Sequence, residues 1–143
     1  MAAVIGAGAA LVVKGADAVL ARLFRYYDKR ADNIDADLAL AHRVIFEVRD
    51  LANDYWCQDR RDEKTEAALT GRLMFLGMVC EGLFKHKPVH HQAIKGQVNR
   101  LDEACTGGDF ATNPRRAAPR RCSDIEIAAY RLAYESGKRH HKL

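Results

Sequence analysis

Apolar residues recur every three or four positions over most of the chain, the spacing of one face of an α-helix. The pattern predicts four helices, over roughly 34–57, 62–85, 88–106 and from Ser123 toward the C-terminus. No stretch alternates apolar and polar residues as a half-buried strand does, and Gly and Pro fall between the periodic segments. The sequence therefore predicts an all-α fold, an antiparallel four-helix bundle preceded by a long N-terminal apolar or amphipathic helix.

Several residues mark where these helices should begin and end. Pro88 suits the first position of the third helix, and Gly107 with Gly108 should terminate it. The sequence "SDIE" has the form of a capping box, with Ser123 as the cap and Glu126 three residues later. We therefore expect the last helix to begin at Ser123.

The residues expected in the core share the helical spacing within each segment. They are Leu38, Ala41, Ile45, Val48, Ala52 and Tyr55, then Leu69, Leu73, Leu76, Cys80 and Leu83, then Ala93, Val98, Leu101 and Cys105, and finally Ile127, Ala128, Tyr130, Leu132 and Tyr134.

The N-terminus is the most apolar part of the chain. "AAVIGAGAALVV", residues 2–13, contains no polar side chain, and after Lys14 and Asp17 the chain is again largely apolar to Phe24. The uninterrupted run is about half of the roughly 20 residues that span a bilayer. No basic residue precedes Lys14, so the run does not resemble a secretory signal. We expect residues 1–30 to form a separate helix and residues 31–143 to form the bundle domain.

One side of this N-terminal helix begins with small residues and ends with charged ones. Small residues four apart let helices approach closely in a bilayer, and a Lys–Asp pair three apart can pair or face water. The residues expected to mediate insertion and self-association are Ala3, Gly6, Ala7, Ala10, Lys14 and Asp17. Three interpretations stay open: an inserted and self-associating helix, a helix on the membrane surface, and a helix packed in a soluble bundle.

The basic residues that follow this helix favour one membrane orientation. Arg22, Arg25, Lys29 and Arg30 come directly after it. By the positive-inside tendency they would place the N-terminus outside and the bundle in the cytoplasm. The alternative is a soluble cytoplasmic protein.

The stretch "TGGDFATNPRRAAPRR", residues 106–121, is a basic connection that is longer than a bundle turn requires. The chain has a net charge of +4, and from Arg115 onward eight Lys/Arg stand against three Asp/Glu. Arginine binds phosphate through two parallel hydrogen bonds. The candidate anion-binding residues are Arg115, Arg116, Arg120 and Arg121, with a nucleic acid or nucleotide as the partner. The alternative is a solvated loop whose charge maintains solubility.

The sequence contains no recognisable catalytic or metal motif. HExxH, P-loop, GxSxG and paired ExxH motifs are missing, so we expect no catalytic residue and no cofactor. His86 and His90 are four apart, but Pro88 lies between them, and no metal site is predicted. No CxxC pair occurs. Cys105 and Cys122 flank the basic connection and would bridge in an oxidising compartment; otherwise all four cysteines are expected to be reduced.

Polar residues crowd the first two helices of the bundle. They are Glu47, Arg49, Asp50, Asn53 and Asp54 in the first, and Arg72 and Glu81 in the second. They predict either a buried acid–arginine contact between helices or ion pairs on a solvated face.

Two functions fit these features. The first is a small, non-enzymatic membrane-associated protein that forms a homo-oligomer through its N-terminal helix and acts as a membrane-perturbing effector. The second is a soluble helical bundle that binds an anionic partner through the arginine-rich connection and the basic tail.

Overall fold

The computed structural model describes residues 33–114 and 116–140. The chain divides into two compact units, Met1–Ala36 and Asp37–Leu143. The predicted N-terminal helix, including Ala3, Gly6, Ala7, Ala10, Lys14 and Asp17, lies outside the described residues.

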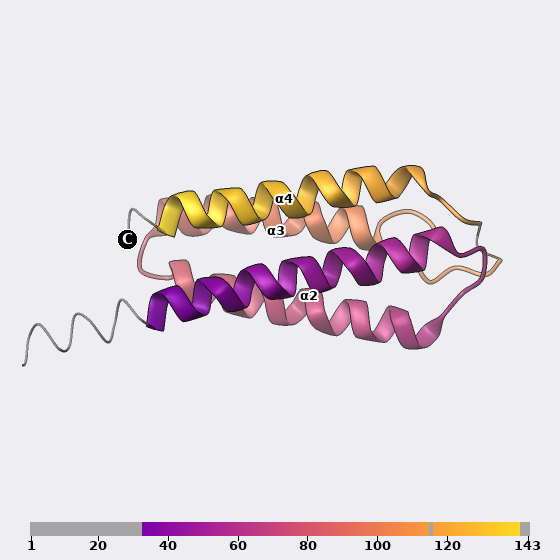
Figure 1. Ribbon diagram of the computed structural model, residues 1–143, viewed down its shortest axis with the longest axis horizontal. Coiled ribbons are helices and arrows are strands. Elements are labelled where there is room, and N and C mark those ends of the chain that lie inside the picture. Colours follow the sequence, from indigo (N-terminus) through magenta and orange to yellow (C-terminus); the bar gives the residue numbers. More distant parts are fainter. Residues whose placement is uncertain (1–32, 115, 141–143) are drawn as a thin grey trace, which may run out of the picture. The chain divides into compact units, whose positions relative to one another are not determined.

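The described residues form four helices and contain no β-strand (Figure 1). The first helix covers residues 33–57 of the described part. It is followed by α2 (Glu63–Phe84), α3 (Pro88–Thr106) and α4 (Arg120–His140). Consecutive helices run antiparallel, and α3 contacts both α2 and α4. The predicted all-α class and helical bundle are confirmed.

Different helix ends and connecting segments lie at the two ends of the bundle (Figure 1). At one end, which we call the linker end, the 33–57 helix stops, α2 begins and residues 107–119 connect α3 to α4. At the other, the turn end, α2 passes into α3 through Lys85, His86 and Lys87, and α4 finishes. The 19 residues of α3 separate these ends by about 28 Å at 1.5 Å per residue.

Three helix ends lie where the sequence predicted them, and local hydrogen bonds or backbone restriction explain each one. Asp62 caps α2, its carboxylate accepting hydrogen bonds from the backbone N–H groups of Lys64 and Thr65. Pro88 occupies the first turn of α3. Gly107 ends α3 and donates its N–H to the carbonyl of Glu103.

The start of α4 differs from the prediction, because the helix begins at Arg120 rather than Ser123. The backbone N–H of Ala118 donates to the carbonyl of Trp56 at 2.9 Å, which fixes the linker against the 33–57 helix. Pro119 then leads directly into the helix, where its restricted φ suits a helical start. Ser123 therefore lies inside the first turn of α4 and does not act as a cap.

Side chains from all four helices fill a single core. The largest fully buried ones are Trp56, Tyr55, Phe84, Ile45, Leu69, Leu76, Ile94, Leu101, Ile125, Leu132, Val44 and Val48. Of the expected core positions, the structure buries Ala41, Ile45, Val48, Ala52, Tyr55, Leu69, Leu73, Leu76, Cys80, Leu101, Cys105 and Leu132. It leaves Leu38, Leu83, Ala93, Val98 and Ala128 half-buried.

The prediction for α4 was right about Leu132 but wrong about one edge of the apolar face. Ile127, Tyr130 and Tyr134 are more than half exposed, and the inward line consists of Ile125, Ala129, Leu132 and Ser136. Ser136 can be buried because its hydroxyl donates to the carbonyl of Ala133 at 2.9 Å and lies 3.1 Å from His42 Nε2. A buried polar side chain that has hydrogen-bond partners cannot be recognised from the spacing of apolar residues alone.

Candidate functional site

Helix α2 carries apolar side chains on two sides, and the bundle covers only one of them. The covered side contains Leu69, Leu73, Leu76, Cys80 and Phe84. On the other side, Met74 and Met78 are each 68% exposed and Phe75 is 38% exposed. Isolated exposed apolar residues are ordinary, whereas large contiguous apolar patches often mark sites of interaction.

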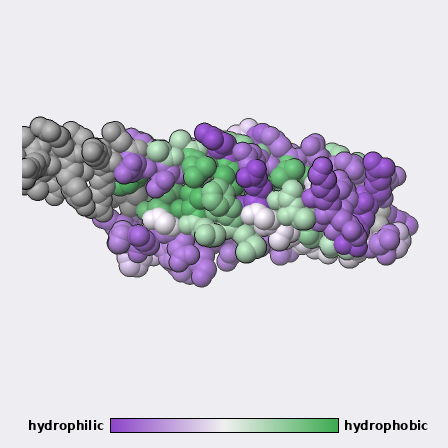
Figure 2. All heavy atoms as spheres, turned by 90° about the horizontal axis from the view of Figure 1, so that it is seen from below, coloured by the Kyte–Doolittle hydropathy of each residue, from purple (hydrophilic) through white to green (hydrophobic). Residues whose placement is uncertain are grey.

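Small residues extend this exposed group along the helix. We call it the apolar face of α2, defined as Ala67, Gly71, Met74, Phe75, Met78 and Gly82. A Cβ atom added at Gly71 or Gly82 would meet nothing within 4 Å, so the surface is open at both positions. Figure 2 views the side of the bundle that carries α2 and shows hydrophobic side chains gathered toward the middle, with hydrophilic ones around them.

Helix α2 is also apolar over most of its length. Among the described residues, it is the one helix long and apolar enough to cross a membrane, judged by length and composition alone. The mean hydropathy of its most apolar 18-residue window is 1.4, and the bundle buries 33% of that window. A helix hidden in the core of a soluble protein would have most of that window buried, so α2 is unusually exposed for its hydropathy.

Lysines stand at both ends of the apolar face. Lys64, Gly71, Met78 and Lys85 are seven residues apart, which is close to two helical turns, so they lie along one line of the helix surface. Both lysines are exposed. Glu81 is also exposed and lies at one edge of the face. At the other edge, Arg72 forms an ion pair with Glu47 at 3.2 Å.

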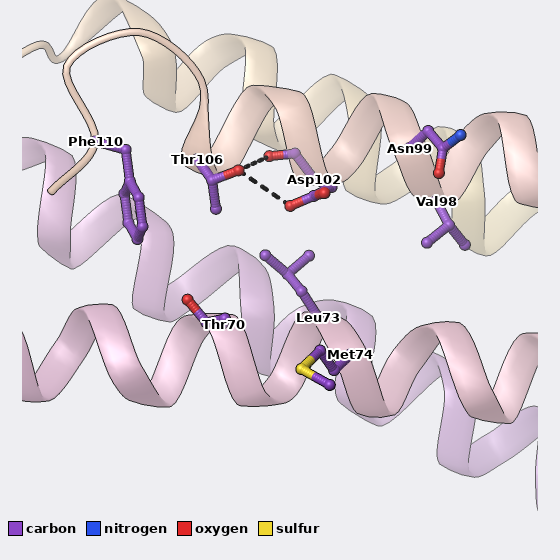
Figure 3. A pocket seen from close by; sticks show the side chains of 8 residues that line it. All are labelled: Thr70, Leu73, Met74, Val98, Asn99, Asp102, Thr106 and Phe110. Atoms are coloured by element: carbon purple, nitrogen blue, oxygen red, sulfur yellow. Dashed lines mark hydrogen bonds between the residues drawn. The ribbon is translucent and has the colours of Figure 1, made fainter.

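A groove between α2 and α3 borders the apolar face at Met74. Figure 3 shows its lining side chains near the linker end, and its volume is about 280 Å³. The Thr106 hydroxyl donates hydrogen bonds to the Asp102 carbonyl at 2.9 Å and to Asp102 Oδ1 at 3.0 Å, so the polar groups of the groove are engaged with each other. The groove therefore has an apolar lining and a polar rim, and its polar side chains do not point together as catalytic groups would.

A second hollow of about 220 Å³ continues along the same two helices toward the turn end. It shares Val98 and Asn99 with the first and adds Cys80, Glu81 and Lys95. Burial raises the pKa of the Cys80 thiol to about 11, so the thiol stays protonated near neutral pH. A protonated, buried thiol is a poor nucleophile, and this hollow does not resemble a cysteine active site.

The structure describes three of the four arginines proposed for anion binding. Arg116 and Arg120 are exposed at the linker end, and Arg115 lies outside the described residues. The guanidinium of Arg121 lies 4.5 Å from the centre of the Trp56 ring, and its Nη1 donates to the Ala104 carbonyl at 3.2 Å. Arg121 thus has packing and hydrogen-bonding partners within the fold.

The polar residues noted in the sequence form partly exposed contacts between helices. Arg72 pairs with Glu47, and Asn53 donates to Glu126 Oε1 at 2.8 Å. The Arg49 guanidinium lies 4.9 Å and 5.9 Å from the ring centres of Phe46 and Tyr130, which contact each other edge to face. These contacts join the 33–57 helix to α2 and α4.

One buried polar cluster was not foreseen from the sequence. Glu66 is 7% exposed, and its Oε1 accepts hydrogen bonds from the Tyr55 hydroxyl at 2.8 Å and from Arg61 Nε at 3.1 Å. The Tyr55 hydroxyl in turn accepts the backbone N–H of Ala111 at 3.1 Å. The five-residue separation of Arg61 and Glu66 across a helix start was the only local sign of this contact.

No group of three or more metal-ligating side chains occurs within 33–114 and 116–140. No family model, curated protein or solved structure matches the chain. Among the described residues, the apolar face of α2 is the surface that stands out most clearly as a candidate site of interaction.

Proposed function

We propose that the protein is a non-enzymatic, membrane-associated helical protein whose bundle binds an anionic bilayer through the apolar face of α2. The observation that carries the proposal is the exposure of Met74, Phe75 and Met78 on a helix that is long and apolar enough to cross a membrane by length and composition. Lys64 and Lys85, at the two ends of that face, would contact anionic headgroups while the apolar side chains enter the interface.

The energetics require a second membrane contact. Full burial of a Met or Phe side chain contributes about 1.5–3 kcal/mol, and a Lys near an anionic surface contributes about 1 kcal/mol. The side chains of the apolar face of α2 would enter the membrane–water interface only in part, so binding through this face alone would be weak and reversible. The apolar N-terminal stretch, residues 2–24, supplies the second contact in this proposal.

The proposal also retains self-association through the N-terminal helix. Ala3, Gly6, Ala7 and Ala10 would allow close helix packing, and the resulting homo-oligomer would perturb the membrane. Lys14 and Asp17 would then face a polar path, with the N-terminus outside and the bundle in the cytoplasm.

Vesicle flotation tests the role of α2. Full-length protein should float with vesicles that contain phosphatidylserine and less well with pure phosphatidylcholine. The double variant Met74→Glu/Met78→Glu should bind at least about tenfold more weakly, since both side chains lose their apolar contact. The matched control is Ile127→Glu, an exposed apolar position on α4 that should leave binding unchanged.

A shortened chain that begins at Asn33 lacks the N-terminal stretch, so it tests the contact made by α2 on its own. It should retain weak binding that the Met74→Glu/Met78→Glu change abolishes. Equal binding of the parent and the double variant, in both the full-length and the shortened chain, would refute docking through α2. A change in oligomer size without a change in vesicle binding would instead identify the face as an interface between copies.

A second candidate is binding of a nucleic acid or nucleotide at the linker end. Arg116 and Arg120 favour it, because both are exposed and neither enters an ion pair among the described residues. Single-stranded RNA binding should fall steeply with salt and should weaken in Arg116→Ala/Arg120→Ala. The control is Lys85→Ala/Lys87→Ala at the turn end, which removes the same charge about 28 Å away.

A further inference from the structure

Two cysteines from distant parts of the sequence meet at the linker end. The Sγ atoms of Cys57 and Cys122 lie 3.6 Å apart although the residues are 65 positions apart in the chain. Cys57 is the last residue of the 33–57 helix and is exposed. Cys122 is the third residue of α4 and is half-buried. Both are free thiols in this structure.

We propose that Cys57 and Cys122 form an oxidation site, at which a small-molecule disulfide such as glutathione disulfide converts the two thiols into an intramolecular disulfide. The sulfur atoms already touch, so the bond requires only a local adjustment of the two side chains. Both thiols are reachable from solvent, unlike Cys80 and Cys105. The proposal is independent of membrane binding by α2.

The different environments of the two thiols assign their roles. Cys57 is exposed, so its thiolate can reach an oxidant in solution. Burial, and next the hydrogen bond with Cys57, raise the pKa of Cys122 to about 11, so Cys122 is seldom a thiolate while Cys57 is reduced. Cys57 is therefore the attacking residue and Cys122 the resolving one.

The exchange balances in two steps. The Cys57 thiolate bonds to one sulfur of glutathione disulfide, whose S–S bond breaks and releases the first glutathione thiolate. Cys122 then gives its proton to solvent and attacks the Cys57 sulfur of the mixed disulfide, which releases the second glutathione thiolate. The protein loses two protons and two electrons in total, and glutathione disulfide is reduced to two thiols.

The new bond would tie the end of the 33–57 helix to the first turn of α4. It would thereby hold the linker end together across residues that are far apart in the sequence. A cross-link over so long a loop restricts the unfolded chain, so we expect the oxidised protein to melt roughly 10 °C higher than the reduced protein.

The experiment incubates the full chain with glutathione disulfide and then measures intact mass, iodoacetamide labelling and Tm. Wild-type protein should lose about 2 Da and its fast-labelling thiol, and its Tm should rise. Cys122→Ser should stop at the stage of a glutathione adduct on Cys57, because the resolving thiol is missing. Cys57→Ser should gain neither an adduct nor a cross-link at a comparable rate.

Peptide mapping decides between the outcomes. A Cys57–Cys122 linked peptide that is removed by dithiothreitol supports the proposal. A stable glutathione adduct on wild-type Cys57, a dimer linked through Cys57, or a bridge that includes Cys105 would each overturn it. The double variant Cys80→Ala/Cys105→Ala is the control, since it lacks both buried thiols and should still form the bridge.

Discussion

The guanidinium of Arg121 lies over the indole ring of Trp56, 4.5 Å from its centre, and donates to the carbonyl of Ala104. The contact joins α4 to the 33–57 helix and to the last turn of α3. Trp56 is itself fixed, because its indole N–H donates to the Cys105 carbonyl at 2.8 Å. Arg121 therefore takes part in holding three helices together at the linker end.

Arg121→Ala should consequently destabilise the fold by about 1–2 kcal/mol, through loss of the cation–π contact, the hydrogen bond and the packing of its stem. Arg116→Ala and Arg120→Ala should each change the free energy of unfolding by less than about 0.5 kcal/mol, because both side chains are exposed. Urea unfolding measures all three. Equal effects would contradict the structural role of Arg121.

A second prediction concerns the buried carboxylate of Glu66. Tyr55→Phe removes the hydroxyl that donates to Glu66 and accepts from Ala111, and should cost about 1–2 kcal/mol. Glu66→Gln keeps the shape of the side chain and should cost about 1–3 kcal/mol, because Arg61 loses the nearer of its two charged partners, Glu66 and Glu63. In the double variant the two effects should couple by about 0.5–3 kcal/mol, and simple additivity would argue against a shared network.

Periodicity and capping residues predicted most of the bundle. Asp62, Pro88 and Gly107 mark helix ends through local hydrogen bonds and backbone restriction, which a sequence shows directly. The early start of α4 was missed because it depends on a tertiary bond between Ala118 and the Trp56 carbonyl.

The surfaces were harder to predict than the helices. The leucine stripe of α2 identified its buried side, but Met74, Phe75 and Met78 lie across the helix, and their exposure depends on how many neighbours surround α2. The proximity of Cys57 and Cys122 likewise depends on how the helix ends meet, whereas the sequence suggested only Cys105 and Cys122 as a conditional bridge.

A third prediction concerns the buried thiols at alkaline pH. Burial raises the pKa of Cys80 to about 11 and that of Cys105 to about 12, against an ordinary value of 9.0. Between pH 9.0 and these values, an unfolded chain loses thiol protons that the folded chain keeps, so stability is complete below pH 9.0 and falls as pH rises. Each thiol contributes a slope of up to about 1.4 kcal/mol per pH unit.

Urea unfolding at a series of pH values from neutral to alkaline tests this dependence. Cys105→Ala should be less stable at neutral pH, because it leaves a small cavity, but should lose less stability on alkalinisation. Parallel curves for the variant and the wild-type protein would exclude Cys105 as a source of the alkaline sensitivity.

The last prediction concerns acid and the cap of α2. The Asp62 carboxylate accepts hydrogen bonds from the Thr65 hydroxyl at 2.7 Å and from the backbone N–H groups of Thr65 and Lys64. The Thr65 hydroxyl, and next the Thr65 N–H, lower the pKa of Asp62 below its ordinary value of 3.8. The stabilisation is therefore complete above pH 3.8 and is lost as pH falls through the lowered value.

Asp62→Asn removes the charge but keeps the helix cap, since an Asn side-chain oxygen can still accept hydrogen bonds from the backbone N–H groups. The difference in Tm between wild-type protein and this variant should be constant above about pH 4 and should shrink on further acidification. Asp59→Asn, which removes an exposed carboxylate from the same connection, is the control for the loss of one negative charge. A Tm difference that persists unchanged at low pH would mean that Asp62 stabilises α2 through its shape and not through its charge.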